Sequence, residues 1–110
     1  MSLPNLSLTD LRAALRRGET SSVAATQAML DRIVDLDNDL QSYLTITDEL
    51  ALAQAAAADA RLAAGDDAPL LGIPIAVKDI ICVEGAPTTA GSKILDGFVP
   101  PYDAYVVHKL

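Results

Sequence analysis

The sequence predicts an α/β fold in which N-terminal helices are followed by the first strand of a mixed sheet. Three observations support this prediction. Three stretches between residues 7 and 64 show helical patterns, and the last of them is rich in alanine. A turn-rich stretch over residues 65–69 then interrupts the helical pattern. Beyond it, residues 73–81 form an apolar, β-branched run with the composition of a buried strand. We therefore divide the chain into a helical front segment, residues 1–65, and the start of an α/β core, residues 66–110.

The first expected helix runs from Ser7 to Arg17. Ser7 can cap its free amide groups, and Asp10 lies three residues further on, as in a capping box. Gly18 ends the helix, because glycine readily takes the conformation found at helix ends. One face of this helix is apolar and carries Leu8, Leu11 and Leu15. This pattern is typical of a helix with one buried face.

A second helix begins within residues 20–22, where threonine and serine are suitable N-caps. It is expected to run to about Leu36, and the polar sequence Asp-Asn-Asp at residues 37–39 is expected to break it. Residues 40–46 show a broken alternation of apolar and polar side chains. This connection could therefore be extended.

The third expected helix is rich in alanine. Thr47 is its N-cap, it reaches about Ala64, and Gly65 ends it. Nine of the fourteen residues from Ala51 to Ala64 are alanine, the residue with the highest helix propensity. A helix with so little side-chain bulk could pack closely against a neighbour. Alternatively, it could be a solvated surface helix that tolerates alanine.

The apolar run that follows residue 72 is interpreted as a strand. Ile73, Ile75 and Val77 alternate onto one face, which puts Lys78 on the other face. Pro74 is expected near the start of the strand, where the absence of a hydrogen-bond donor is tolerated. The strand therefore ends near Lys78.

Glycine, proline and threonine residues then indicate a loop over residues 85–91, and a further helix begins near Asp103. One strand with a few helices cannot pair the backbone edges of the strand or cover an apolar sheet on both faces. We therefore expect the 110 residues to be the front part of a larger domain.

Composition excludes several classes of protein. The net charge of −7 argues against direct nucleic-acid binding, which needs clustered lysine and arginine, and against an anionic membrane surface. No apolar stretch is long enough for a transmembrane helix, and the N-terminus lacks the features of a signal peptide. The single cysteine, Cys82, cannot form an internal disulfide, and no cluster of ligands indicates a metal site. These features predict a cytoplasmic protein.

Lys78 is the candidate for chemistry. It ends an apolar strand, where a charge is costly to bury unless it is paired. Desolvation there favours the neutral amine, the form that acts as a general base. The alternative is a strand-end lysine whose ammonium group reaches solvent or pairs with Asp79. The residue pattern alone leaves both interpretations open.

Other polar residues fit catalysis less well. Ser92 lacks the pattern of a nucleophile elbow, and its expected role is to cap a turn. Thr88 and Thr89 are expected to form hydrogen bonds within the loop, and they could line a site. Cys82 is expected to be a small core residue, and His108 is expected on a helix surface.

Three segments resemble the amidase-signature enzymes. Residues 72–79, Gly-Ile-Pro-Ile-Ala-Val-Lys-Asp, are similar to the catalytic-lysine segment of that family, and residues 88–95 follow at the family's usual distance. Residues 98–104 are similar to one branch, the A subunits of glutamyl-tRNA(Gln)/aspartyl-tRNA(Asn) amidotransferases. Ile80 and Tyr105 depart from the usual residues, Asn and Thr. The resemblance covers nearly the whole chain.

The resemblance implies that residues 1–110 are the N-terminal part of one amidase domain, which contains a mixed sheet. The family's catalytic triad consists of a serine nucleophile, a second serine joined by a cis peptide, and a lysine. Only the lysine maps onto this sequence, at Lys78. Both serines are expected beyond residue 110, so the 110-residue chain alone is expected to be inactive.

In the amidotransferase branch, the A subunit hydrolyses glutamine and works with B and C subunits. The ammonia released is used to amidate mischarged Glu-tRNA(Gln) or Asp-tRNA(Asn). The resemblance therefore implies that glutamine is the substrate, that ATP, magnesium and tRNA are bound by a partner subunit, and that no cofactor binds this chain. Two alternatives stay open: a stand-alone amidase of the same family, and a helical assembly fragment without catalysis.

Overall fold

In the computed structural model, which describes residues 2–110, the chain forms two compact units. The first unit contains the residues up to Ser42 together with Asp48–Ile75, and the second contains Tyr43–Thr47 and Ala76–Leu110. Long helices build the first unit, whereas turns and short helical segments build the second. None of the helices described is long and apolar enough to cross a membrane.

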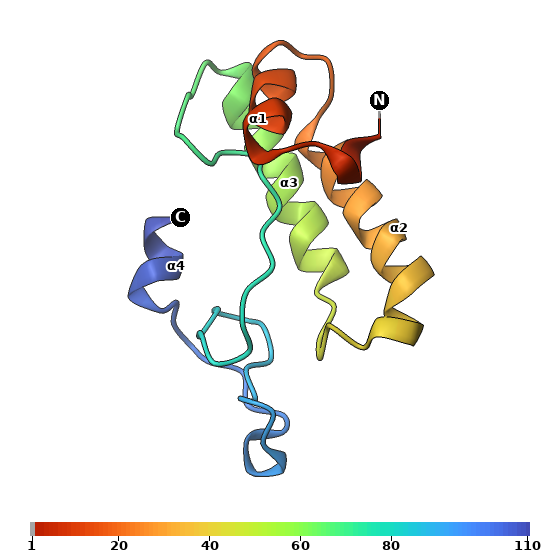
Figure 1. Ribbon diagram of the computed structural model, residues 1–110. Coiled ribbons are helices and arrows are strands. Elements are labelled where there is room, and N and C mark those ends of the chain that lie inside the picture. The colour runs from red at the N-terminus through yellow and green to blue at the C-terminus, as the bar shows by residue number, and fades with distance from the viewer. Residues whose placement is uncertain (1) are drawn as a thin grey trace. The chain divides into compact units, whose positions relative to one another are not determined.

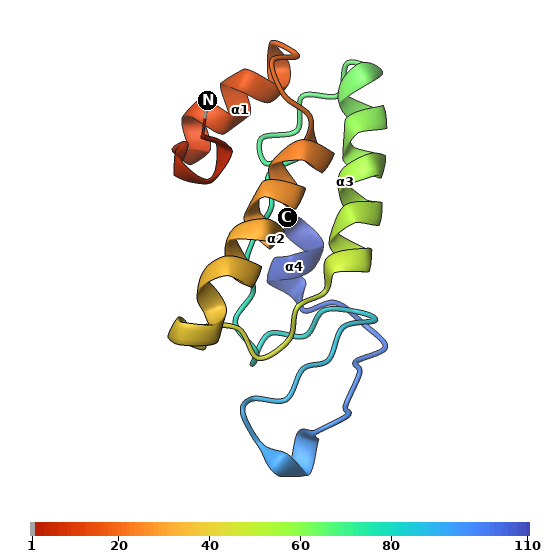
Figure 2. The same ribbon diagram turned by 90° about the vertical axis from the view of Figure 1, so that its right-hand side faces the viewer.

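Three α-helices make up most of the first unit (Figures 1 and 2). They are α1 (Leu8–Arg16), α2 (Ser22–Leu40) and α3 (Asp48–Ala63), and a 3-10 turn, η1 (Leu3–Asn5), precedes them. α2 and α3 run antiparallel and pack along each other (Figure 2). Ala55 of α3 is buried, although most alanines of this helix remain exposed. Of the two possibilities left open for this helix, close packing therefore holds around Ala55, whereas most of its alanines lie on an exposed surface.

Local sequence signals set the beginnings of α1 and α2. The amide of Asp10 donates to the Ser7 hydroxyl at 3.1 Å, and that hydroxyl donates to the Asp10 carboxylate at 2.7 Å. The amide of Ala24 donates to the Ser21 hydroxyl at 3.0 Å. The N-caps predicted for both helices are therefore confirmed.

The predicted end of α2 is wrong. The helix continues through residues 37–39 and ends at Leu40. Gln41 then takes a left-handed conformation with φ of 51°, and its amide donates to the Asp37 carbonyl at 2.7 Å. The amide of Ser42 donates to the Asp37 carboxylate, also at 2.7 Å. Asp37 thus stabilises the end of the helix instead of breaking it.

A small apolar core lies in the first unit. Its buried members are Leu11, Leu15 and Ala25, and Leu3, Leu6, Leu62 and Ile73 pack against it. Gly72 passes close to this core, because a Cβ atom there would lie 3.2 Å from Leu62 Cδ1 and 3.3 Å from Leu15 Cδ1. Gly72 also has a φ of +84°, which side chains rarely tolerate. Both facts explain why glycine precedes the segment that leads to Lys78.

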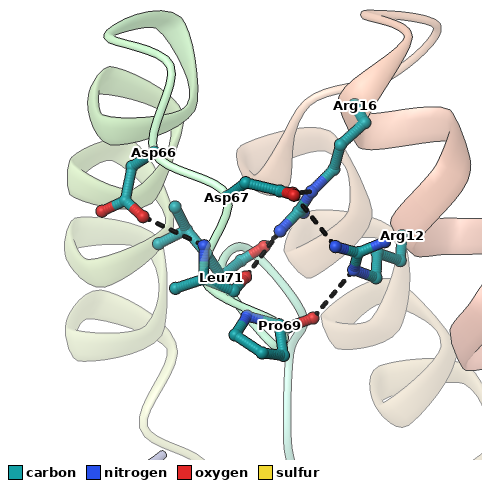
Figure 3. Close-up of polar contacts among 7 residues, drawn as sticks. Arg12, Arg16, Asp66, Asp67, Pro69 and Leu71 are labelled. Carbon is teal, nitrogen blue, oxygen red and sulfur yellow. Dashed lines mark hydrogen bonds and ion pairs between the residues drawn. The ribbon is translucent and has the colours of Figure 1, made fainter.

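Two arginines of α1 hold the turn that follows α3 (Figure 3). We call Arg12, Arg16 and the turn over residues 66–71 the arginine clamp. Both arginines donate to the Asp67 carboxylate. Arg16 also donates to the Ala68 and Leu71 carbonyls, and Arg12 to the Pro69 carbonyl. All five bonds measure 2.6–3.1 Å. The hydrogen bond from Arg16 and the charge of Arg12 lower the pKa of Asp67. The clamp fixes the path of the chain towards Gly72.

Asp59 of α3 stabilises the first turn of α2. Its carboxylate accepts hydrogen bonds from the amides of Ser22 and Val23 at 2.6 and 3.1 Å. A negative charge is favourable there, because the N-terminus of a helix carries a partial positive charge. The buried Ser22 hydroxyl donates to the Gly72 carbonyl at 2.9 Å. These contacts join both long helices to the chain before Ile73.

The strand predicted over residues 73–77 is not present, and no β-strand occurs in the part of the chain that the structure describes. A strand needs a partner whose backbone pairs with it, and residues 2–110 provide none. The helix predicted near Asp103 is confirmed as α4 (Tyr105–Lys109). A second 3-10 turn, η2 (Lys93–Leu95), was not predicted.

Candidate functional site

Lys78 lies in the second unit, where the chain makes a tight turn. The Lys78 carbonyl accepts a hydrogen bond from the Ile81 amide at 2.9 Å. The Lys78 side chain is exposed, and within residues 2–110 it takes part in none of the ion pairs. The desolvation expected at the end of a buried strand is therefore not provided by the residues described.

Asp79 makes its contacts with the loop that follows, not with Lys78. Its carboxylate accepts hydrogen bonds from the Thr89 amide at 2.9 Å, from the Thr89 hydroxyl, and from the Gly91 amide at 3.2 Å. Its main-chain carbonyl accepts from the Ala90 amide at 2.9 Å. The interpretation in which Lys78 pairs with Asp79 is therefore wrong. The exposed side chain of Lys78 agrees with an amine that reaches solvent.

We call Asp79, Thr89, Ala90 and Gly91 the Asp79 latch. Two backbone amides and one hydroxyl of its loop donate to the Asp79 carboxylate, an arrangement that favours a negative charge. The hydroxyl of Thr89 lowers the pKa of Asp79, and the amides of Thr89 and Gly91 act in the same direction. The Asp79 carboxylate therefore stays ionised while it holds the loop.

The loop of the latch belongs to a larger folded-back segment. Residues 82–88 and 98–104 lie side by side, although neither forms a regular strand. Three main-chain hydrogen bonds join them: Gly85 amide to Pro100 carbonyl, Thr88 amide to Phe98 carbonyl, and Ala104 amide to Cys82 carbonyl. In addition, the Glu84 amide donates to the Asp103 carboxylate. Thr88 and Pro100, one from each arm, are both buried. The loop of the latch is thus part of a segment that has buried residues of its own.

The other candidate residues take structural positions. The Ser92 hydroxyl accepts from the Ile94 amide at 3.2 Å and caps η2, as predicted. His108 is exposed on α4, also as predicted. Cys82 is half-buried instead of being a core residue, and its Sγ atom lies 3.8 Å from the Tyr102 hydroxyl.

The sequence made Lys78 the candidate residue, but it did not predict the contacts of Asp79 with residues 89–91. The available signal was the pair of threonines and the glycine ten to twelve residues after Asp79. Threonine and glycine are common in loops, so this spacing alone does not indicate a contact. Across residues 2–110, no group of three or more His, Cys, Asp or Glu residues could hold a metal ion.

Comparison with known proteins adds independent observations. A family model described as Amidase matches residues 24–110. The A subunit of the glutamyl-tRNA(Gln) amidotransferase of Geobacter metallireducens is 56% identical over 110 residues, which is 100% of this chain and 23% of that protein. The protein of the same name from Methylococcus capsulatus is 58% identical over 102 residues, which is 93% of this chain and 21% of that protein.

A solved structure has the same local fold. It is described as a vestigial protein complex that reveals the evolutionary origins of an s-triazine catabolic enzyme. One of its chains has a TM-score of 0.87 and 32% sequence identity, covering 94% of this chain and 23% of that chain. The chain described here thus spans less than a quarter of the length of each of these relatives.

Proposed function

The chain belongs to the amidase family, and we propose that it supplies the catalytic lysine, Lys78, of a glutamine-hydrolysing amidotransferase. The observation that carries the proposal is the identity of 56–58% to proteins named as the A subunit of glutamyl-tRNA(Gln) amidotransferase. Because the chain spans less than a quarter of those proteins, the proposal concerns a protein of the relatives' length.

In the proposed reaction, the neutral amine of Lys78 acts as the general base. It takes a proton, through a second serine joined by a cis peptide, from a serine nucleophile, and both serines belong to a part of the protein outside residues 2–110. The serine attacks the side-chain amide of glutamine, and the leaving ammonia takes up the proton. Water then hydrolyses the acyl-enzyme to glutamate. In support, the Lys78 side chain is exposed and unpaired among the residues described, so its amine is available.

We further propose that residues 73–77 become a strand of a mixed sheet in the longer protein. Ile75, Val77 and Ile80 are 49%, 41% and 60% exposed, and such apolar side chains favour burial against a further layer. In a strand, Ile80 would share a face with Lys78, opposite Ile75 and Val77. A layer on that face would desolvate Lys78 and favour its neutral form. Residues 1–65 would then be the helical front of one amidase domain, and residues 66–110 the start of its core. A structure of the longer protein in which residues 73–77 are helical would contradict this proposal.

The ammonia would pass to a partner protein, within a complex that contains B and C subunits, and would amidate mischarged Glu-tRNA(Gln) or Asp-tRNA(Asn). ATP, magnesium and tRNA would bind to the partner and not to this chain. The net charge of −7 supports this division, because tRNA binding needs clustered basic residues. A cytoplasmic location follows from this role.

A stand-alone amidase is the second candidate. The observation in its favour is the structural likeness, at 32% identity, to a chain whose description concerns an s-triazine catabolic enzyme. The fold of residues 2–110 alone therefore does not select glutamine. A helical assembly fragment without catalysis is the third candidate, and loss of activity on substituting Lys78 would argue against it.

The test is Lys78→Ala and Lys78→Arg in the complete protein with its partner subunits. We expect both variants to lose at least about 100-fold in the rate of glutamine hydrolysis, because arginine stays protonated and cannot act as a base. Lys93→Ala, at another exposed lysine, is the matched control and should keep the wild-type rate. Near wild-type hydrolysis by a folded Lys78→Ala protein would remove the catalytic role. Faster turnover of a simple aliphatic amide than of glutamine would favour the stand-alone amidase.

A further inference from the structure

We propose that Asp79 is a positioning residue, which holds the 89–91 turn and thereby fixes the place from which the Lys78 amine acts. This inference rests on the proposed catalytic role of Lys78. In the proposed reaction, Asp79 itself contacts none of the reacting groups. Its effect passes through the backbone of the residue next to it.

The contacts of Asp79 fix the main chain directly after Lys78. Both the side chain and the carbonyl of Asp79 accept hydrogen bonds, so this residue is held at two places by residues 89–91. The Lys78 carbonyl is held as well, by the Ile81 amide at 2.9 Å. The Lys78 side chain itself is exposed. A base whose backbone is fixed loses less entropy when it reaches its reactive position.

The turn is held in a conformation that it does not prefer. Ala90 has a φ of 51°, in the left-handed region, and Gly91 follows with a φ of 66°. A residue with a Cβ atom costs about 1–2 kcal/mol in this region. The Ala90 amide donates to the Asp79 carbonyl, which stabilises this conformation. Ala90 thus holds backbone strain in the turn that binds Asp79, the residue next to the proposed catalytic lysine.

The chemistry of the latch requires aspartate and not asparagine. Three donors, two from Thr89 and one from Gly91, converge on the two carboxylate oxygens. An asparagine side chain has only one oxygen, and its NH2 group would face one of these donors. At least one donor would then lose its partner. Position 89 likewise requires a hydroxyl group, because the Thr89 hydroxyl donates to Asp79 and also accepts from the Gly91 amide at 3.2 Å.

The experiment compares Asp79→Asn, Thr89→Val and Thr89→Ser in the complete protein with its partner subunits. Valine removes the hydroxyl but keeps the shape of threonine, whereas serine keeps the hydroxyl. We expect Asp79→Asn and Thr89→Val to lower kcat for glutamine by about 10- to 100-fold, as for a misplaced catalytic group, with KM changed by less than about 3-fold. Thr89→Ser should keep kcat within about 3-fold of wild type. Asp96→Asn, at an exposed aspartate, is the control and should leave kcat unchanged.

A second readout does not depend on activity. Hydrogen exchange at the amides of Thr89, Ala90 and Gly91 should be faster in Asp79→Asn than in the wild-type protein. If exchange accelerates but kcat stays at the wild-type value, Asp79 is only structural and the inference is overturned. Unchanged exchange would overturn the latch itself. The proposed function fails if the wild-type protein does not hydrolyse glutamine or if Lys78→Ala still does. Hydrogen exchange tests the latch in either case, so failure of the function and failure of the latch are distinguishable.

Discussion

At Gly72, the backbone conformation and the neighbouring side chains both require glycine. A Cβ atom would approach Leu62 and Leu15, and the φ of +84° is unfavourable for any side chain. Gly97 has almost the same φ, +82°, but a Cβ atom there would have no heavy atom within 4 Å. A side chain at Gly97 would therefore have only the cost of the backbone conformation, whereas a side chain at Gly72 would also have the cost of crowding.

This difference gives a prediction for Gly72→Ala. The variant should lower the free energy of unfolding by about 1–3 kcal/mol, because backbone strain and crowding add together. Gly97→Ala, with the backbone term alone, should have a smaller effect. The free energies come from urea denaturation followed by circular dichroism. Equal losses in the two variants would mean that the contacts with Leu62 and Leu15 do not matter.

Single residues also mark what the sequence could predict. Ser7 was predicted as an N-cap, and a second N-cap was predicted within residues 20–22, where the structure has Ser21. Such caps are predictable because the groups they bind lie only three residues away. Gln41 and Asp79 were not predicted in their roles. The left-handed residue at a helix end is usually glycine or asparagine, so a glutamine at position 41 did not indicate it. The partners of Asp79 lie ten to twelve residues away in a loop. Contacts across a loop depend on its three-dimensional path, which short motifs do not encode.

At the scale of elements, the arginine clamp joins α1 to the turn after α3. Arg16 uses its whole guanidinium group, because Nε, Nη1 and Nη2 each donate to a different acceptor. Its side chain is 19% exposed, so these bonds are partly shielded from water. The adjacent Arg17 is exposed instead and pairs with Glu19. Neighbouring arginines on one helix thus differ in how much they contribute to the fold.

We predict that Arg16→Lys destabilises the protein by about 1–3 kcal/mol. An ammonium group is a point charge on a flexible chain and cannot reach three acceptors in the geometry of the guanidinium fork. The matched control, Arg17→Lys, should change the free energy of unfolding by less than about 0.5 kcal/mol, as is usual for surface positions. Thermal unfolding measures both. A neutral Arg16→Lys would show that the clamp adds nothing to stability.

The helices were predicted more successfully than the strand, for a physical reason. Caps, alanine content and an apolar face are local properties, and the sequence around α1 and α3 shows them directly. The strand over residues 73–77 depends on backbone partners that residues 2–110 do not contain. Its apolar, β-branched composition remains, but composition alone does not make a strand.

For the whole molecule, acidic residues link folding to pH. The pKa values of Asp66, Asp67 and Asp79 lie below the ordinary value of 3.8, because Arg61, Arg16 and Thr89, respectively, donate hydrogen bonds to them. Each carboxylate therefore binds a proton more readily in the unfolded chain than in the folded one. Their contribution to stability is present above pH about 4 and is lost as the pH falls further.

We predict that the urea midpoint of the wild-type protein falls between about pH 5 and about pH 3. A double variant, Asp66→Asn with Asp67→Asn, should be less stable at about pH 6 and should show a weaker dependence on pH in this window. The measurement is the midpoint at several pH values and constant ionic strength. Parallel curves for the two proteins would mean that these two carboxylates do not carry the acid sensitivity.

The short span of the Asp79 latch has a consequence for chain entropy. Its hydrogen bond from Thr89 closes a loop of ten residues, whereas the bond from Arg16 to Leu71 in the arginine clamp joins residues 55 positions apart. The entropy lost on closing a loop grows with the logarithm of its length, so the latch closes at a cost about 1.5 kcal/mol lower. The turn beside Lys78 can therefore form as a local event, before distant parts of the chain have met.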